Sequence, residues 1–346
     1  MKALVYYGPR DIRYEDFADP AIVEPTDAIM RVERSGICGS DLHIYHGQGF
    51  SADTAFCVGH EAVGEIVEVG PNVRRLTPGA RVMLSAAVGC GRCGKCLAGH
   101  VARCETGGAA CYGLSAVLQG CQAELVRVPM ADFNAGPIPE GISSDQALML
   151  TDNLPTAYYG CLNAEIGPGK TVAVIGLGPI GLMAVEIAFV LGASRVYAID
   201  FVPERRALAE QLGAEPVDGA NAIAEVTAKT KMRGVDCAVE ASGSDATVGM
   251  AIALTGIGGT ASVVGVNLSP AFQFPMAMAF IKNMTFRIGT CSVQCHWPDL
   301  VRLIEAGRLH PERAISHHMP LSQGTDAYRL FDARENGALK MVLTSG

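Results

Sequence analysis

A chain of 346 residues, of which 49% are hydrophobic and 18% charged, is long enough for two domains with substantial cores. This composition excludes a disordered protein. The net charge of −8 argues against a nucleic-acid polyanion as the main partner, although it is compatible with a local basic patch.

The apolar segments and the cysteine content bear on the cellular location of the protein. The first residues read as a strand, since they lack the longer apolar core and cleavage site of a signal peptide. Without a secretory signal, the twelve cysteines favour metal binding over disulfides. We therefore expect a cytoplasmic location. The most apolar run, residues 171–190, contains three glycines, Pro179 and Glu186, so we expect a buried strand and helix there rather than a membrane span.

The first 150 residues predict a β-rich domain. Short apolar runs occur at residues 29–33, 65–69, 81–84 and 124–128, separated by proline and glycine turns. Short strands with frequent turn signals are typical of an all-β domain or a partly open barrel.

A stretch near the N-terminus carries several metal-binding side chains. Cys38 and His60 offer a thiolate and an imidazole, and a catalytic zinc has three such protein ligands plus an open position. A third ligand must therefore come from further along the chain. Residues 62–70 alternate polar and apolar side chains as a strand does, so we expect the pair at the mouth of the domain rather than in a core.

Four cysteines follow in one short segment: Cys90, Cys93, Cys96 and Cys104. Glycines between them allow the tight turns that wrap four thiolates around one ion. Four thiolates close the coordination shell, which is typical of a structural zinc. The alternatives are an iron–sulfur cluster, which four thiolates also hold, and four unrelated free thiols.

From about residue 155 the sequence predicts an α/β domain. The expected elements are strands at residues 171–175, 195–200, 235–243 and 260–266 and helices at residues 182–191 and 202–212. The first strand is a continuous β-branched and apolar run, as in a buried parallel sheet. Near residue 290 the alternation ends, and we expect the chain to return to the first domain with a last short strand at residues 338–343.

The glycines after the first of these strands predict a dinucleotide site. Gly176, Gly178 and Gly181 form a G-x-G-x-x-G turn, and Asp200 follows about twenty residues later. This acid would accept the ribose hydroxyls and repel a 2′-phosphate, so we expect NAD rather than NADP. The alternative is a glycine-rich turn of some other α/β domain. Further cofactor candidates are Pro179 and Ile180 in the turn, Arg205 in the next helix, and Ser242, Gly265 and Val266 at strand ends.

These motifs stand in the order of a known family. With residues 36–43, residues 59–65, the four-cysteine segment and the glycine turn, the chain resembles the zinc-dependent medium-chain alcohol dehydrogenases over essentially its whole length. The resemblance implies a GroES-like catalytic domain interrupted by a Rossmann NAD-binding domain, with the active-site cleft between them. The implied ranges are 1–153 and 296–346 for the catalytic domain, 90–104 for its structural-zinc lobe and 154–295 for the Rossmann domain.

The resemblance also implies the missing ligand. Asp152 stands in a Thr-Asp-x-x-Pro-Thr segment that resembles bacterial members with aspartate as third zinc ligand, where many other members have cysteine. Aspartate is anionic like a thiolate, so zinc stays formally neutral with Cys38 and His60, while the harder oxygen leaves it more Lewis-acidic. The alternative for Asp152 is a helix N-cap.

Other roles carry over by position. Ser40 resembles the hydroxyl that hydrogen-bonds the reacting oxygen, and His43 the base that relays its proton toward solvent. Asp41 would orient His60, and Glu61, behind the metal, is a candidate transient ligand. The alternatives are a turn residue for Asp41 and a solvated histidine for His43.

The implied reaction is hydride transfer between a primary or secondary alcohol and NAD, with two zinc ions per chain in a homo-oligomer, a tetramer rather than a dimer. A polyol, sugar or formaldehyde-type dehydrogenase of the same family is the alternative, and a non-enzymatic structural role a more distant one. Zinc-free quinone or enone reductases share the fold but lack both cysteine motifs. We expect neither a nucleic-acid nor a membrane partner. Candidates for the substrate wall are Tyr45, Phe50, Tyr112, Leu154 and Trp297.

Overall fold

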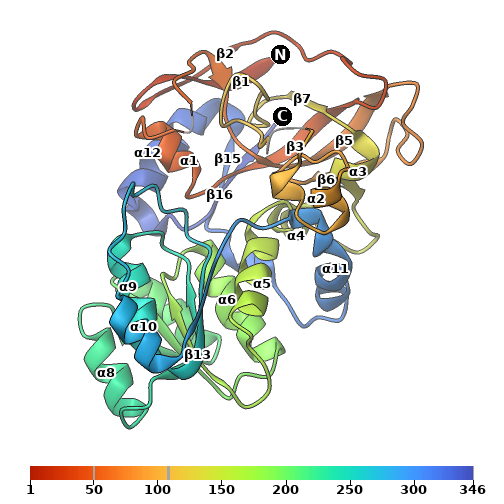
Figure 1. The fold of residues 1–346 in the computed structure, drawn as a ribbon. Helices are drawn as coiled ribbons and strands as arrows, with labels where there is room; N and C mark the ends of the chain where they lie inside the picture. The colour runs from red at the N-terminus through yellow and green to blue at the C-terminus, as the bar shows by residue number, and fades with distance from the viewer. Residues whose placement is uncertain (50, 107–109, 346) are drawn as a thin grey trace. The chain divides into compact units, whose positions relative to one another are not determined.

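The computed structural model describes residues 1–49, 51–106 and 110–345 (Figure 1). The chain forms two compact units: Met1–Pro155 together with Ser292–Gly346, and Thr156–Cys291. It therefore leaves the first unit once and returns to it. No helix among the described residues is long and apolar enough to cross a membrane.

The first unit contains two β-sheets. The larger sheet has the order β15-β16-β3-β5-β6-β8, and β7 also pairs with β3. Its strands are β3 (Ala28–Ile37), β5 (Glu61–Val69), β6 (Arg81–Leu84), β7 (Leu125–Val128), β8 (Ala135–Pro137), β15 (His317–Pro320) and β16 (Met341–Thr344). The smaller sheet, in the order β2-β1-β4, consists of β1 (Lys2–Gly8), β2 (Asp11–Asp16) and β4 (Phe56–Cys57). Because β3 pairs with both β5 and β16, segments far apart in the sequence lie side by side.

Short helices and two apolar cores complete the first unit. The helices are α1 (Asp41–Tyr45), α2 (Gly94–Leu97), α3 (Ala131–Asn134), α4 (Ser144–Met149), α11 (Trp297–Glu305) and α12 (Gly324–Ala333), with 3-10 turns η1 (Val101–Arg103), η2 (Val293–Cys295), η3 (Pro311–Ala314), η4 (Leu321–Gln323) and η5 (Glu335–Gly337). One core lies on the larger sheet and includes Met30 and Ile66. The other joins the smaller sheet to α12 and includes Leu4 and Tyr328.

The second unit is built on one parallel sheet with the order β11-β10-β9-β12-β13-β14. Its strands are β9 (Thr171–Ile175), β10 (Arg195–Asp200), β11 (Glu215–Asp218), β12 (Val235–Glu240), β13 (Thr255–Val263) and β14 (Thr285–Ile288). The helices are α5 (Asn153–Asn163), which begins in the first unit, α6 (Pro179–Val190), α7 (Pro203–Gln211), α8 (Ala222–Lys229), α9 (Asp245–Leu254) and α10 (Met276–Lys282). The strand order changes direction between β9 and β12, which is where open α/β sheets bind their ligands.

Several predicted elements are confirmed with their bounds. The strands expected at residues 171–175 and 195–200 are β9 and β10. The helix expected from residue 182 begins earlier, at Pro179, because proline is well suited to the first turn of a helix. The α/β class with a β-rich first domain is confirmed, and α11 and α12 are additional helices of the first unit that the strand signals did not predict.

Candidate metal centre and cofactor site

Four side chains from separate segments of the first unit meet in one cluster. Cys38 follows β3, His60 precedes β5, Glu61 begins β5 and Asp152 precedes α5. Their ligand atoms all lie within 4.8 Å of one another. Asp152 Oδ2 is 3.4 Å from Cys38 Sγ and 3.6 Å from His60 Nε2. The structure thus brings Asp152 to the two residues with which the resemblance groups it.

The charges of this cluster compensate one another. Burial alone would raise the pKa of Asp152, but hydrogen bonding and attraction from His60 hold that pKa at about 2. Burial opposes protonation of His60, yet Asp41 and Asp152 raise its pKa well above the usual value. Burial raises the pKa of the Cys38 thiol. A thiol, an imidazole and a carboxylate that converge in this way are the donor set that zinc takes, so the residues present fit the ion.

The cluster is closed on most sides. Cys38 and His60 are only 7% and 3% exposed. Glu61, at which the strand begins, is buried too, and the position of the cluster at the mouth of the domain stays a prediction. Asp152 is half-buried and marks the more open side of the cluster.

Asp41 and Ser40 surround the imidazole of the cluster. Asp41 Oδ2 accepts a hydrogen bond from the Cys38 backbone N–H at 2.9 Å, and its Oδ1 lies 3.2 Å from His60 Nδ1. One carboxylate therefore fixes the ligand loop and orients the ring with Nε2 toward the other donors. Ser40 Oγ lies 3.4 Å from that Nε2. His43 is half-buried on α1, its backbone N–H donates to the Ser40 carbonyl at 3.2 Å, and its role as a proton relay stays a prediction.

Two further buried residues, Lys340 and Asn153, belong to the cluster, and neither was predicted. Lys340 pairs with Glu61 Oε2 and donates to the Ile37 carbonyl at 3.2 Å. Asn153 Nδ2 donates to Glu61 Oε1 at 2.8 Å. The signal for Lys340 was present, since it is the only charged residue in the apolar run at residues 338–343. A buried charge at the start of a buried strand needs a partner.

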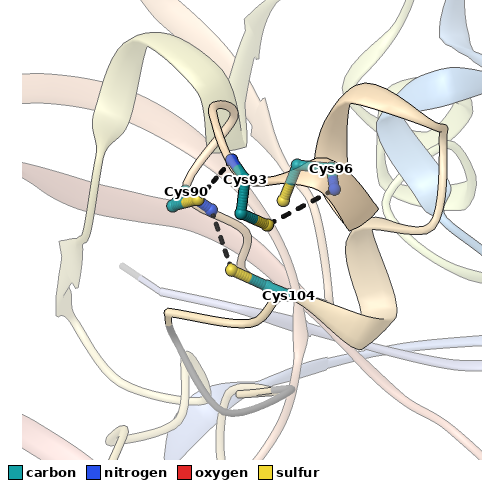
Figure 2. Close-up of side chains that lie close together, drawn as sticks. All are labelled: Cys90, Cys93, Cys96 and Cys104. Atoms are coloured by element: carbon teal, nitrogen blue, oxygen red, sulfur yellow. Dashed lines mark hydrogen bonds between the residues drawn. The ribbon is translucent and has the colours of Figure 1, made fainter.

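The four cysteines of the predicted lobe point toward one another (Figure 2). Their sulfur atoms all lie within 4.8 Å of one another. The backbone N–H groups of Cys90 and Cys93 donate to Cys104 Sγ and Cys90 Sγ, both at 3.3 Å. A hydrogen bond to Thr106 lowers the pKa of Cys90 to about 6, whereas burial raises the pKa of Cys96 to about 12. Four converging sulfurs fit one ion with a closed coordination shell.

The glycine turn lies between β9 and α6 in the second unit. Gly176 has φ +87°, a conformation that other residues rarely adopt, and a Cβ on Gly181 would lie 1.8 Å from the Gly176 carbonyl oxygen. A Cβ on Gly178 would meet nothing within 4 Å, so there is open space in front of the helix. Pro179 occupies the first turn and no side chain caps it, which leaves N–H groups such as that of Ile180 to an anionic ligand.

Asp200 ends β10 beside this turn. Its Oδ2 accepts a hydrogen bond from Leu177 N at 2.7 Å, and its Oδ1 accepts one from Val202 N at 2.8 Å. Arg205 Nη1 lies 3.9 Å from Asp200 Oδ2. The carboxylate therefore ties the glycine turn to the end of the strand and carries an arginine at its side.

Residues that follow β12 and β13 reach the same turn from the other side. A Cβ on Gly176 would lie 2.9 Å from Ser242 Cβ, and a Cβ on Gly265 would lie 2.2 Å from Gly243 N. A Cβ on Gly243 would in turn lie 2.3 Å from the Val266 carbonyl oxygen. The candidate cofactor residues are thus gathered at the carboxyl ends of the parallel strands, and this cradle fits a dinucleotide.

Most candidates for the substrate wall are packed inside the first unit. Tyr112 and Leu154 are fully buried, and Tyr45 belongs to the core of the smaller sheet, so their place in the substrate wall stays a prediction. Trp297 lines an open cavity of about 530 Å³ on the first unit. Phe50 lies outside the described residues.

Comparisons with known proteins agree with this arrangement. The model of the alcohol dehydrogenase GroES-like domain matches residues 24–140, and that of zinc-binding dehydrogenases matches residues 179–306. A probable zinc-binding alcohol dehydrogenase of Mycobacterium tuberculosis is 39% identical over 99% of this chain and 88% of its own length. The solved structure of alcohol dehydrogenase TADH from Thermus sp. ATN1 is 40% identical, covers 100% of both chains and has a TM-score of 0.94.

Another solved structure, zinc dependent alcohol dehydrogenase 2 from Streptococcus pneumonia, is 33% identical with a TM-score of 0.93, and the match covers 100% of this chain and 98% of the other. These matches extend over both units, and they agree with the converging metal donors and the glycine turn. They confirm a GroES-like domain and a Rossmann domain. The chain belongs to the zinc-dependent medium-chain alcohol dehydrogenase family.

Proposed function

We propose that this zinc-dependent alcohol oxidoreductase uses NAD to interconvert primary or secondary alcohols with aldehydes or ketones. The alcohol carbon gives a hydride to the nicotinamide and the alcohol oxygen gives up a proton, so the products are the carbonyl compound, NADH and H⁺. The observation that supports the proposal most is the buried cluster of Cys38, His60 and Asp152, with its more open side at Asp152.

Each residue around the cluster has a task in this reaction. A zinc ion supplies Lewis acidity, which favours loss of the alcohol proton. Asp41 holds His60 in one orientation through Nδ1, so that Nε2 stays directed into the cluster. Ser40 Oγ, 3.4 Å from that Nε2, is positioned to hydrogen-bond the reacting oxygen and to pass its proton toward His43.

Metal analysis together with an activity screen tests this proposal. We expect two zinc ions per chain, one in each donor cluster, and NADH formation with members of a panel of aliphatic, aromatic and polyol alcohols. Iron, with the visible absorption of an iron–sulfur cluster, would contradict the zinc assignment of the four-cysteine lobe. A single zinc ion per chain without turnover of any alcohol would instead support a non-enzymatic, structural role for the protein.

The choice of NAD depends on Asp200. A solved relative from Escherichia coli, 25% identical with a TM-score of 0.88, is complexed with NADH, and one from Sinorhizobium meliloti, 29% identical with a TM-score of 0.85, is bound to NADP. The family therefore leaves both cofactors open. In this chain a carboxylate with 8% exposure stands beside the glycine turn, where it would repel a 2′-phosphate.

Exchanging Asp200 for glycine should shift the cofactor preference toward NADP. Removal of the like charge should change the ratio of kcat/KM for NADP to that for NAD by roughly 10- to 100-fold, equivalent to about 1.4–2.8 kcal/mol. The measurement is initial-rate kinetics with each cofactor at a fixed alcohol concentration. Asp200→Asn removes the charge, keeps the size and retains one of the two acceptor oxygens that bind Leu177 N and Val202 N, so it separates loss of charge from loss of both hydrogen bonds. A parent enzyme that already prefers NADP would refute this role of Asp200.

A polyol is the second candidate substrate class. The solved 2R,3R-butanediol dehydrogenase from Bacillus subtilis is 26% identical with a TM-score of 0.86, and the match covers 100% of this chain and 99% of the other. A vicinal diol that reacts with a higher kcat/KM than the corresponding monoalcohol would favour this class. Formaldehyde belongs in the same screen, since it tests the formaldehyde-type alternative.

We also propose a homo-oligomer, a tetramer rather than a dimer. The apolar side chains of Met276, Phe280 and Ile281 on α10 and of Ile288 on β14 are 68%, 84%, 77% and 64% exposed. Because β14 is an outer strand of its sheet, this surface combines an open edge with apolar side chains and suits pairing with a second copy. Light scattering should give a molar mass that is a multiple of the chain mass, and the measured molar mass should be lower for Phe280→Lys. A monomeric parent would contradict the proposal.

The remaining partners are small molecules in this proposal, an alcohol or carbonyl substrate, with neither nucleic acid nor a membrane. All twelve cysteines lie in the described part of the chain as free thiols, which suits a reducing compartment. We therefore place the enzyme in the cytoplasm, and cell fractionation with an antibody to the chain is the corresponding measurement.

A further inference from the structure

Asn153, the first residue of α5, lies beside three acceptors of the metal cluster. Its amide nitrogen is 2.8 Å from Glu61 Oε1, 2.9 Å from Asp152 Oδ2 and 3.6 Å from Cys38 Sγ. Carboxylates and a thiolate only accept hydrogen bonds, so the NH₂ end of the amide must face them. Asn153 Oδ1 is buried and has no hydrogen-bond partner among the residues that the structure describes. The three acceptors therefore dictate how this amide is oriented.

An amide carries two N–H hydrogens, so Asn153 cannot give each of three acceptors a hydrogen of its own. In the structure the two carboxylates hold the short hydrogen bonds, and the sulfur of Cys38 is in longer contact. The same nitrogen could instead donate to Asp152 and Cys38 and release Glu61, which would be a second arrangement. The two arrangements differ only in which acceptor receives the second hydrogen.

Glu61 has one oxygen that can change its partner. Its Oε2 pairs with Lys340, which is fully buried and also donates to the Ile37 carbonyl at 3.2 Å. Gly36 makes room for that pair, because a Cβ there would lie 2.0 Å from Oε2. Oε1 accepts its hydrogen bond from Asn153 and from no other residue that the structure describes. Glu61 also lies among the other donors, since one of its carboxylate oxygens is within 4.8 Å of their ligand atoms.

We propose that Asn153 is a positioning residue that decides whether Glu61 binds the catalytic metal. While Asn153 donates to Glu61, the carboxylate stays off the metal and the fourth position is open to substrate. When the hydrogen goes to Cys38 instead, Glu61 occupies that position. The hydrogen bond then reduces the charge that the Cys38 thiolate donates to the metal, which offsets the negative charge of the Glu61 carboxylate. The inference rests on the proposed function of this cluster as the catalytic metal site.

The test replaces Asn153 with leucine, which is similar in size but has no N–H donor. Cobalt(II) in place of the catalytic zinc reports a change of ligands through its visible absorption, without any turnover. We expect the resting spectrum of Asn153→Leu to shift to that of cobalt with an added carboxylate ligand. The kcat/KM for the alcohol should fall about 10- to 100-fold, as for other outer partners of metal ligands. The metal content should equal that of the parent.

A double variant separates the switch from general damage. In Asn153→Leu with Glu61→Gln the competing carboxylate is absent, so spectrum and kcat/KM should return to those of Glu61→Gln alone. Asn153→Ser, with one O–H hydrogen in place of two N–H hydrogens, should give an intermediate spectrum and serves if the leucine variant does not fold. Asn163→Leu, at the other end of α5, is the matched control and should keep the parent spectrum.

An unchanged cobalt spectrum in both Asn153 variants would overturn the inference, and so would losses that simply add in the double variant. Failure of the underlying function looks different. If the parent cluster bound no metal, or if Asp152→Ala kept full activity, the function proposed for this cluster would be wrong instead. The spectrum and the metal content therefore distinguish the two failures.

Discussion

Replacing Asp152 with alanine should abolish alcohol oxidation and leave one metal ion per chain instead of two. Asp152 Oδ2 is the oxygen that lies 3.4 Å from Cys38 Sγ and 3.6 Å from His60 Nε2, so its loss opens the cluster on one side. A Lewis acid contributes several kcal/mol to such a reaction, so kcat should fall by roughly 1,000-fold or more. The measurements are steady-state NADH formation and metal analysis of the purified variant.

Two further variants make this result specific to the ligand. Asp326→Ala removes an exposed aspartate from the first turn of α12 and should change neither activity nor metal content. Asp152→Cys restores an anionic donor of the kind that zinc also takes, and it should recover the second metal ion with part of the activity. Full activity in Asp152→Ala would show that Asp152 only caps α5.

Changing Cys104 to serine should remove the metal from the four-cysteine lobe and lower the Tm. The small apolar cluster of this lobe consists of Cys96, Val101 and Cys104, with Cys90, Cys93 and Phe133 packed against it. The lobe therefore has almost no apolar core apart from its metal-binding side chains, and the metal must supply the stability. We expect a loss of about 2–3 kcal/mol and a Tm lower by at least about 5 °C.

Cys295→Ser is the matched control for this change. Cys295 is exposed, and its sulfur lies 3.9 Å from the carbonyl of Gly99 in the same lobe, but it is not one of the four converging cysteines. The Tm of the Cys295→Ser variant should stay within about 1 °C of the Tm of the parent protein, as for most exposed substitutions. Calorimetry measures the Tm of both variants, and metal analysis measures their metal content. A Cys104→Ser protein with two metal ions and the parent Tm would exclude a metal role for the lobe.

Local patterns in the sequence were sufficient for four of the six strands of the parallel sheet, whereas β11 and β14 were not predicted and β13 begins five residues earlier than expected. β9 and β10 have the predicted bounds because a β-branched run and a glycine turn determine where such a strand begins and ends. The four cysteines were equally visible, since the whole set lies between Cys90 and Cys104. Cys38 and His60 could be named from their side-chain chemistry alone.

Contacts between distant segments could not be predicted in this way. Asp152 was assigned through the resemblance, because a separation of more than a hundred residues carries no local signal of proximity. The pairing of Lys340 with Glu61 depends on the register of β16 against β3, in which Met341 lies opposite Ile37. No periodicity within either strand encodes that register, so the fold had to be seen before this pair could be identified.

The place of β16 in the larger sheet bears on how the protein is made. Synthesis proceeds from the N-terminus, and domains generally fold as units while the chain emerges. The second unit is one continuous segment, Thr156–Cys291, so its core can form before the segment from Ser292 to the C-terminus has been synthesised. β7 pairs with residues 28–31 of β3, but residues 34–37 must wait until Met341 pairs with Ile37 and brings Lys340 to Glu61. We therefore expect the catalytic cluster to be completed last, with zinc entering only after this strand has left the ribosome.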